Sequence, residues 1–311
     1  MAAVFIAFIV TAVGTRFLIP WLIKQKMNQT EREEGVQSHL EKAGTPTMGG
    51  LAIVAGIVVA TLFFLPGHLA QAPVLFLTLG FGVIGFLDDY LKVFLRRSDG
   101  LIAWQKLLLE IAVTAVFLLL LTKASRIPLD LLVPLAGGKT ISIGRAAVPF
   151  AFIVILATVN GVNFTDGLDG LASSVTAVVA LFMAVFAYQR DGSVTPMSLA
   201  VVGALFGFLL FNAYPAKVFM GDTGSLALGG FVAGAAYVLQ IPLYIPIIGF
   251  IYAIELLSVA MQVTYFKATH GKRIFKMTPI HHHFELSDWS ETRIVTVFTI
   301  VTALLCFLAL R

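Results

Sequence analysis

Long apolar segments follow one another along almost the whole chain, separated by short polar connections. A membrane-spanning helix needs about 20 mostly apolar residues. Runs of roughly this length occur at 3–23, 48–65, 72–90, 104–122, 147–160, 169–189, 197–214, 223–240, 242–264 and 290–310. Only 12% of the 311 residues are charged, whereas about 25% is usual for soluble domains. The pattern predicts an all-α integral membrane protein of about ten transmembrane helices, forming a single domain over residues 1–311.

Proline and glycine modify this regular pattern in two places. The stretch 123–146 contains several of them and predicts a loop or hairpin between two spans. Pro246 and Gly249 lie inside the ninth apolar run and predict a kink there.

Lysine and arginine predict the orientation of the chain, because basic residues gather in cytoplasmic connections. The sixth connection has only Arg190, but the fourth is an exception, with Lys123, Arg126, Lys139 and Arg145. Most of the others lie in the first, third, seventh and ninth connections: Lys24, Lys26, Arg32, Lys42, Lys92, Arg96, Arg97, Lys217, Lys267, Lys272, Arg273 and Lys276. We therefore expect the odd connections to be cytoplasmic and both termini to be extracytoplasmic.

Five aspartates lie at these odd connections: Asp88, Asp89, Asp166, Asp169 and Asp222. Carboxylates near a bilayer are costly and usually functional, and adjacent carboxylates repel unless a cation holds them. The alternative interpretation is that each is a solvated helix end. Their shared side and the glycines beside them favour one active site on the cytoplasmic face.

The first aspartate pair ends the third apolar run. On a helix, Asp88 and Lys92 share a face, while Asp89 points about 100° away. Carboxylates beside an ammonium suit a site that holds magnesium and phosphate together. An exposed helix end with a surface ion pair is the alternative.

Two glycine-rich segments carry further polar candidates. Asn160, Asn163, Asp166, Gly167 and Asp169 join two apolar runs, where they could read a nucleobase edge, bind a metal or cap a helix.

The second such segment opens the 223–240 run with Gly-Asp-Thr-Gly-Ser. Its main-chain N–H groups at a helix N-terminus suit a phosphate, and Asp222 could carry the metal. Asn212 and Phe219 precede it. Phe219 could stack on a uracil ring or simply pack against a neighbouring helix.

Three consecutive histidines, His281, His282 and His283, lie in the ninth connection beside a basic cluster. Zinc ligands are normally spaced apart in sequence, so phosphate binding is the better hypothesis, with a surface loop as the alternative. In the first connection, Lys42 could reach a phosphate. Thr45 or Thr47 could cap the second helix.

Together these motifs resemble the phospho-N-acetylmuramoyl-pentapeptide transferases, within the polyprenyl-phosphate N-acetylhexosamine-1-phosphate transferase superfamily. Asp88-Asp89, the Asn-Phe-Thr-Asp-Gly-Leu-Asp-Gly stretch and Met-Gly-Asp-Thr-Gly-Ser are similar to superfamily features. Thr-Pro-Thr-Met-Gly-Gly and Pro-Ile-His-His-His-Phe-Glu are similar to the muramoyl-pentapeptide branch.

The resemblance implies transfer of phospho-N-acetylmuramoyl-pentapeptide from UDP to undecaprenyl phosphate, giving lipid I and UMP in peptidoglycan synthesis. It also implies a magnesium cofactor, a homodimer, nucleoside antibiotics as inhibitors, no nucleic-acid partner, and a multi-pass protein of the bacterial cytoplasmic membrane. The implied catalytic residues are Asp88, Asp89, Asp222 and His281, with magnesium on Asp222. The implied substrate-binding residues are Lys42, Thr47, Lys92, Lys106, Asn160, Asn163, Asp166, Gly167, Asp169, Asn212, Phe219, Gln262, His281, His282 and His283.

Several alternatives stay open at this point. The transfer could be direct or pass through an aspartyl-phosphate, and Asp88 could act as a base or position its substrate. A transporter would place ionisable groups near the membrane midplane, where only Glu110 and Glu255 occur. A transferase that uses UDP-N-acetylglucosamine is disfavoured by the three histidines, and a structural scaffold by the five aspartates.

Overall fold

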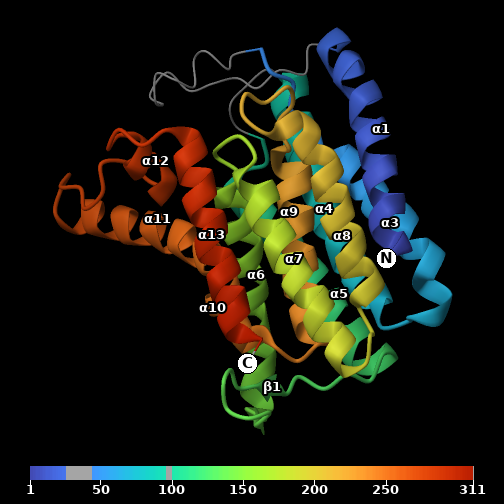
Figure 1. Cartoon of the computed structure of the whole chain (residues 1–311). Coiled ribbons are helices and arrows are strands. Elements are labelled where there is room, and N and C mark those ends of the chain that lie inside the picture. The colour runs from blue at the N-terminus through green and yellow to red at the C-terminus, as the bar shows by residue number, and fades with distance from the viewer. Residues whose placement is uncertain (26–43, 96–99, 311) are drawn as a thin grey trace.

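The computed structural model describes residues 1–25, 44–95 and 100–310, most of which are helical. The helices are α1 (Ala2–Lys24), α3 (Gly50–Phe64), α4 (Gln71–Leu95), α5 (Ala103–Leu119), α6 (Ala147–Thr165), α7 (Leu171–Arg190), α8 (Thr195–Asn212), α9 (Gly221–Val238), α10 (Ile245–Ile248), α11 (Phe250–Ala268), α12 (Ile280–Glu285) and α13 (Glu291–Ala309). Most of them run side by side as a bundle (Figure 1).

The helices bear out the predicted membrane architecture in its coarse form. In the described part of the chain, eight helices are long and apolar enough to cross a membrane, or nine if the bent pair α10–α11 counts as one. A helix overlaps each predicted run, but α9 is not among those eight. The count of ten spans, the side of each terminus and the side of the active site therefore stay predictions.

Helix α9 forms the centre of the bundle. Every residue from Thr223 to Val238 is buried, and the helix packs against α3, α4, α6 and α7. Its glycines permit these close contacts, because a Cβ at Gly229 would lie 2.6 Å from Cα of Val159 in α6. Small residues are the usual means by which membrane helices approach one another closely.

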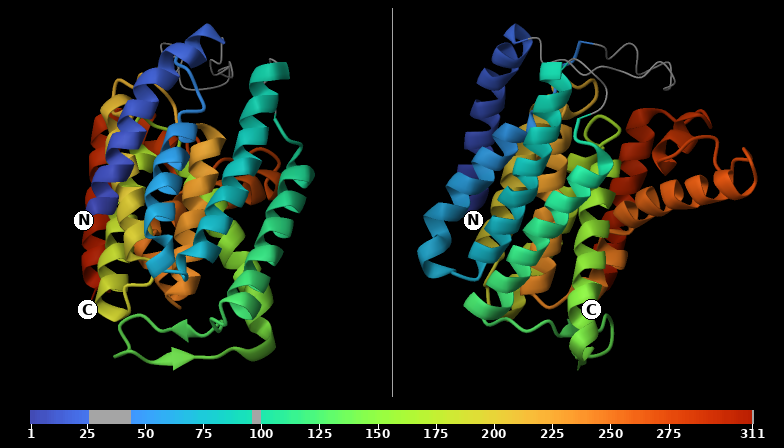
Figure 2. Two further views of the ribbon diagram at one scale, coloured as in Figure 1. Left: turned by 90° about the vertical axis from the view of Figure 1, so that its right-hand side faces the viewer. Right: turned by 180° about the vertical axis from the view of Figure 1, so that it is seen from behind.

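The ninth predicted span is broken, which agrees with the kink expected from Pro246 and Gly249. The segment Pro242–Ile248 and helix α11 meet at 84°. Gly249 caps the new helix, and α11 then leaves the bundle at a steep angle (Figures 1 and 2).

The region 123–146 forms the predicted hairpin. Strand β1 (Leu131–Leu132) pairs antiparallel with β2 (Thr140–Ile141), which is a small β element in the expected all-α fold. This hairpin lies at one end of the bundle, while α12 lies toward the other end (Figure 1).

Candidate active site

The predicted site residues gather where helices end or begin at one end of the bundle. The C-terminal parts of α4 and α6 carry Asp88, Asp89, Asn160 and Asn163. The N-terminal parts of α5 and α9 carry Lys106 and Asp222. Helix α6 is longer than the predicted 147–160 run, so both asparagines project from its last turns instead of from a loop.

Asp222 is the point at which these helices meet. Its Oδ2 atom accepts hydrogen bonds from Lys92 Nζ at 3.2 Å and from Lys106 Nζ at 3.1 Å. Its Oδ1 atom accepts one from Asn163 Nδ2 at 2.9 Å, and Asn163 also donates to Ser225. Three other helices, α4, α5 and α6, therefore direct polar side chains at this one carboxylate.

Asp89 caps the helix to which Asp222 belongs. Its Oδ1 atom accepts a bond from the main-chain N–H of Asp222 at 3.0 Å. Its Oδ2 atom accepts bonds from the N–H of Thr223 at 2.8 Å and from the Thr223 hydroxyl at 2.6 Å. The expectation that these two N–H groups bind a phosphate is therefore wrong, because a buried carboxylate already satisfies them.

Asp88 has partners at both of its carboxylate oxygens. Oδ2 lies 2.6 Å from Lys92 Nζ, so the predicted pairing of Asp88 with Lys92 along one helix face is confirmed. Oδ1 accepts a hydrogen bond from the main-chain N–H of Leu101 at 2.8 Å. Asp88 thus holds both a cation of the site and the start of the segment that leads into α5.

Asp166 follows the last residue of α6 and is partly buried. The loss of hydration raises the pKa of its carboxyl well above the ordinary value, and the charges of Asp222 and Asp89 raise it further. A bound cation would act in the opposite direction and favour the ionised form of this carboxyl.

Glu110 is a site residue that the motifs did not identify. It is buried in α5, and its Oε2 atom accepts a hydrogen bond from Asn160 Nδ2 at 3.1 Å. Asn160 Nδ2 also donates to the main-chain oxygen of Leu156 at 3.0 Å, which fixes the orientation of the amide. The sequence feature that could have identified Glu110 is its position as a charged residue within an apolar run.

Asp169 and Asn212 shape the loop between α8 and α9. Asp169 Oδ2 accepts from the N–H of Ala216 at 2.9 Å, and Asn212 Nδ2 donates to the carbonyl of Val218 at 3.0 Å. These side chains, predicted to face uridine, thus support the loop that carries Phe219. Phe219 itself is half-buried, so both interpretations of its ring stay open.

Gln262, also predicted on the uridine side, holds the connection after α11. Its Oε1 atom accepts from the N–H groups of Ile274 at 3.0 Å and Phe275 at 3.1 Å. Its Nε2 atom donates to the Phe275 carbonyl at 3.2 Å.

The three histidines have different partners. His281 Nδ1 lies 3.1 Å from Glu255 Oε2, and His282 Nδ1 lies 2.7 Å from Glu285 Oε2. His283 Nδ1 accepts a bond from the N–H of Lys276 at 3.2 Å.

Three predicted residues remain: Thr47 and Lys42 of the first connection, and Gly167, which lies beside His281. Thr47 is buried beside Gly221. A Cβ added at Gly221 would lie 2.9 Å from the hydroxyl oxygen of Thr47. The N-cap position of α3 is Gly49, and within the part of the chain that the structure describes no side chain caps this helix, so the predicted cap by a threonine is wrong. Lys42 lies outside the described residues. A Cβ at Gly167 would clash with the His281 ring.

The cluster has the chemical character of a magnesium and phosphate site. Among the described residues, no group of three His, Cys, Asp or Glu side chains is arranged as a ready metal cage. Magnesium does not need one, because it usually takes one or two carboxylates together with substrate phosphates. Two lysine ammonium groups on Asp222 show that this oxygen attracts cations, so the residues fit such an ion.

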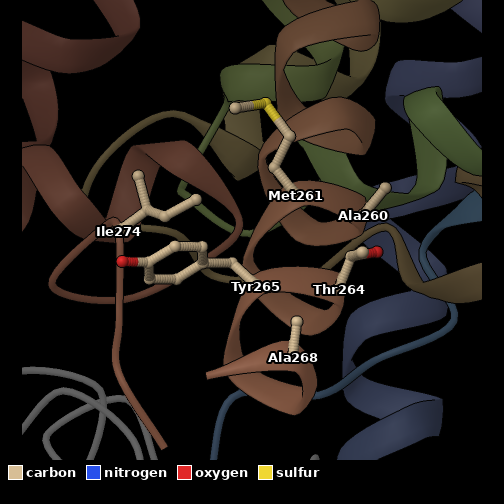
Figure 3. Close-up of a pocket in the computed structure, with 6 residues that line it drawn as sticks. All are labelled: Ala260, Met261, Thr264, Tyr265, Ala268 and Ile274. Atoms are coloured by element: carbon tan, nitrogen blue, oxygen red, sulfur yellow. The ribbon is translucent and has the colours of Figure 1, made fainter.

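An apolar pocket of about 460 Å³ lies on α11, beyond the bend. Figure 3 shows the side chains that line it: Ala260, Met261, Thr264, Tyr265, Ala268 and Ile274.

Comparison with known proteins gives consistent matches over nearly the whole chain. The family model described as glycosyl transferase family 4 matches residues 71–240. Signature 1 of phospho-N-acetylmuramoyl-pentapeptide-transferase matches residues 42–54. A protein of that name from Acetivibrio thermocellus is 48% identical over 302 residues, which cover 94% of this chain and 90% of the relative. Another from Clostridium perfringens is 46% identical over 310 residues, covering 99% of this chain and 96% of the relative.

Proposed function

Because the chain belongs to the phospho-N-acetylmuramoyl-pentapeptide transferase family, we propose that it makes lipid I. The reaction transfers phospho-N-acetylmuramoyl-pentapeptide from its UDP-linked donor to undecaprenyl phosphate and releases UMP. This is the first membrane step of peptidoglycan synthesis. The observation that carries the proposal is the Asp222 carboxylate, which two lysines and an asparagine from three other helices contact directly.

Phosphoryl transfer requires the protein to align the attacking and leaving oxygens and to neutralise charge, and it requires little covalent chemistry from the protein. An oxygen of the lipid phosphate attacks the phosphorus next to the sugar and forms a new P–O bond. The bond between that phosphorus and the bridging oxygen breaks, and the electron pair leaves with UMP. Lys92 and Lys106 both contact Asp222, and in this proposal they neutralise the negative charge of the two phosphate groups as these approach.

Asp88 supports the reaction by positioning. The second pKa of a phosphate monoester is about 6, so the lipid phosphate is mostly a dianion at neutral pH. It needs no base to become nucleophilic. Both Asp88 oxygens already have partners, Lys92 and the N–H of Leu101, which favours a role in orienting the lysine.

Asp222 would hold magnesium, with phosphate oxygens of the substrates as further ligands. The ion supplies electrostatic stabilisation of the phosphate charge that develops during transfer. Asp89 then has the separate task of fixing the N-terminal turn of α9, and with it the position of Asp222.

The substrates also constrain where the site lies. The nucleotide is soluble in water and the polyprenyl tail is not, so the site must open to both phases. Lys92, which belongs to one of the connections rich in basic residues, contacts Asp222 directly. This supports a cytoplasmic site in the bacterial inner membrane, because basic residues gather in cytoplasmic connections. The pocket on α11 (Figure 3) is a suitable apolar surface for the first isoprene units of the tail.

The homodimer and the binding of nucleoside antibiotics stay predictions from the family resemblance.

The test is UMP release by the purified protein, with each substrate omitted in turn, with and without magnesium. We expect release only when both substrates and magnesium are present, and loss of activity in Asp222→Ala. The matched control is Asp191→Ala, which removes an exposed carboxylate at the far end of α7. UMP release without undecaprenyl phosphate, or full activity in Asp222→Ala, would contradict the proposal.

A further inference from the structure

Two ionisable side chains form a pair that is isolated from water. Glu255 in α11 is 0% exposed and His281 in α12 is 1% exposed. His281 Nδ1 lies 3.1 Å from Glu255 Oε2. Buried carboxylates are rarely kept without a function, because taking the charge out of water costs free energy.

The opposite nitrogen of the same ring has no partner. His281 Nε2 is buried and makes no hydrogen bond to any residue that the structure describes. It lies against Gly167, where an added Cβ would come within 2.2 Å of it. Gly167 directly follows Asp166, so the ring edge faces the loop that carries Asp166 and Asp169.

The chemistry of the pair determines how the ring is presented. An ionised carboxylate only accepts hydrogen bonds, so Nδ1 must carry a proton to bond with Glu255. Nε2 is then the ring atom left for the substrate side, and it must carry a second proton to donate to a phosphate oxygen. A phosphate-bound His281 ring is therefore an imidazolium, whose charge the Glu255 carboxylate balances. Histidine ligands in other proteins are fixed in the same way by a carboxylate that sets the tautomer and the ring orientation.

We infer that Glu255 is a positioning residue for the transfer reaction: it holds the His281 ring through Nδ1–H and balances the positive charge that the ring carries when Nε2–H donates, past Gly167, to a phosphate of the bound nucleotide. Glu255 acts through His281 alone and touches no substrate. The inference rests on the proposed function, in which His281 contacts a phosphate group.

Kinetics of a double-mutant cycle test this role. We expect Glu255→Gln to lower kcat by about 10-fold to 100-fold, with the KM of each substrate within about threefold, because a neutral amide cannot balance the charge of a ring that donates through both nitrogens. In the His281→Gln background, Glu255→Gln should have no further effect on kcat. Independent, multiplicative effects, or an unchanged kcat in the single variant, would overturn the inference.

Ser258→Ala is the control for damage to α11. Ser258 is buried in the same helix, and its hydroxyl donates to the main-chain oxygen of Glu255 at 2.8 Å. Its kcat should stay near that of the wild type. A loss as large as that of Glu255→Gln would assign the effect to the helix, and the inference would fail.

Nitrogen-15 NMR of labelled histidine side chains in the wild-type protein gives a readout that needs neither activity nor a stable Glu255 variant. His281→Gln identifies the signals. A proton on Nδ1 is expected, and a ring protonated only on Nε2 would overturn the inference. The proposed function itself fails only if the wild type shows no UMP release that depends on both substrates, so the two failures are distinguishable.

Discussion

The carboxylate of Asp89 accepts a hydrogen bond from the main-chain N–H of Asp222, at 3.0 Å between Oδ1 and N. One member of the aspartate pair in α4 is thus a helix cap for α9, and the other, Asp88, is bonded to Lys92. Adjacent residues in the sequence therefore have different tasks, and substitutions at the two positions should have different consequences.

Asp89→Asn should lower both stability and activity. An amide has only one acceptor oxygen, so it cannot accept all the hydrogen bonds that Asp89 receives from Asp222 and Thr223. Loss of a cap costs about 0.5–2 kcal/mol of unfolding free energy, and the displaced Asp222 should reduce kcat by about tenfold or more. Thermal unfolding and UMP release measure the two effects. Ser290→Ala, which removes the cap of α13, should lower stability alone; an equal loss of activity there would show that cap removal acts nonspecifically.

Lys106→Met should reduce kcat by about 10-fold to 100-fold, because a hydrogen bond from a charged group is worth about 1.5–3 kcal/mol. Lys106 contacts Asp222 in the structure but lies on a different helix from the aspartate pair. Steady-state kinetics of UMP release give the comparison. Lys139→Met removes an exposed cation at the hairpin end of the bundle and is the control; equal losses in the two variants would mean that total charge, and not this contact, matters.

Asp166→Asn should stabilise the protein free of substrate and magnesium, more at pH 8 than at pH 5. The pKa of Asp166 is raised in the folded state, so the folded protein binds its proton more tightly than the unfolded chain does. Between the ordinary pKa and the raised value, the wild type therefore loses unfolding free energy as pH rises. Asparagine has no proton to lose. Melting temperatures across this pH range check the prediction, and a difference that does not change with pH would contradict it.

Ala260→Trp should weaken the use of the lipid substrate without changing the use of the nucleotide. The indole would fill the pocket on α11, where we place the tail. We expect the KM for undecaprenyl phosphate to rise about tenfold, equivalent to about 1.4 kcal/mol of binding, while the KM for the UDP-linked donor stays constant. Leu257→Trp, at an exposed position of the same helix, is the control. A parallel rise of both KM values would place the tail elsewhere.

The sequence carried enough information to predict the helices and most of the cluster. Apolar runs of spanning length have few alternatives to a helix, and aspartates at the ends of such runs stand out because the surroundings are apolar. The pairing of Asp88 with Lys92 followed from helix geometry alone. The roles of His281 and Asp222 rested on the family resemblance and remain to be tested.

Contacts between segments that are distant in the sequence could not be predicted from it. Nothing local to Asp89 indicates that it caps a helix that begins more than a hundred residues later. Gln262 was expected to face uridine, but its amide bonds to the loop after α11. The 84° bend at Gly249 was foreseen as a kink without its size, because packing against other helices decides the angle.

The order in which the site residues are synthesised has a consequence for biogenesis. Aspartates and lysines enter the membrane with α4 and α5, Asp222 follows with α9, and the histidines come last, in α12. A ribosome that stalls before α12 leaves an inserted chain that holds the acidic half of the site without His281. With the role proposed for His281, such a fragment would consume no nucleotide precursor, and activity would appear only when translation is nearly finished.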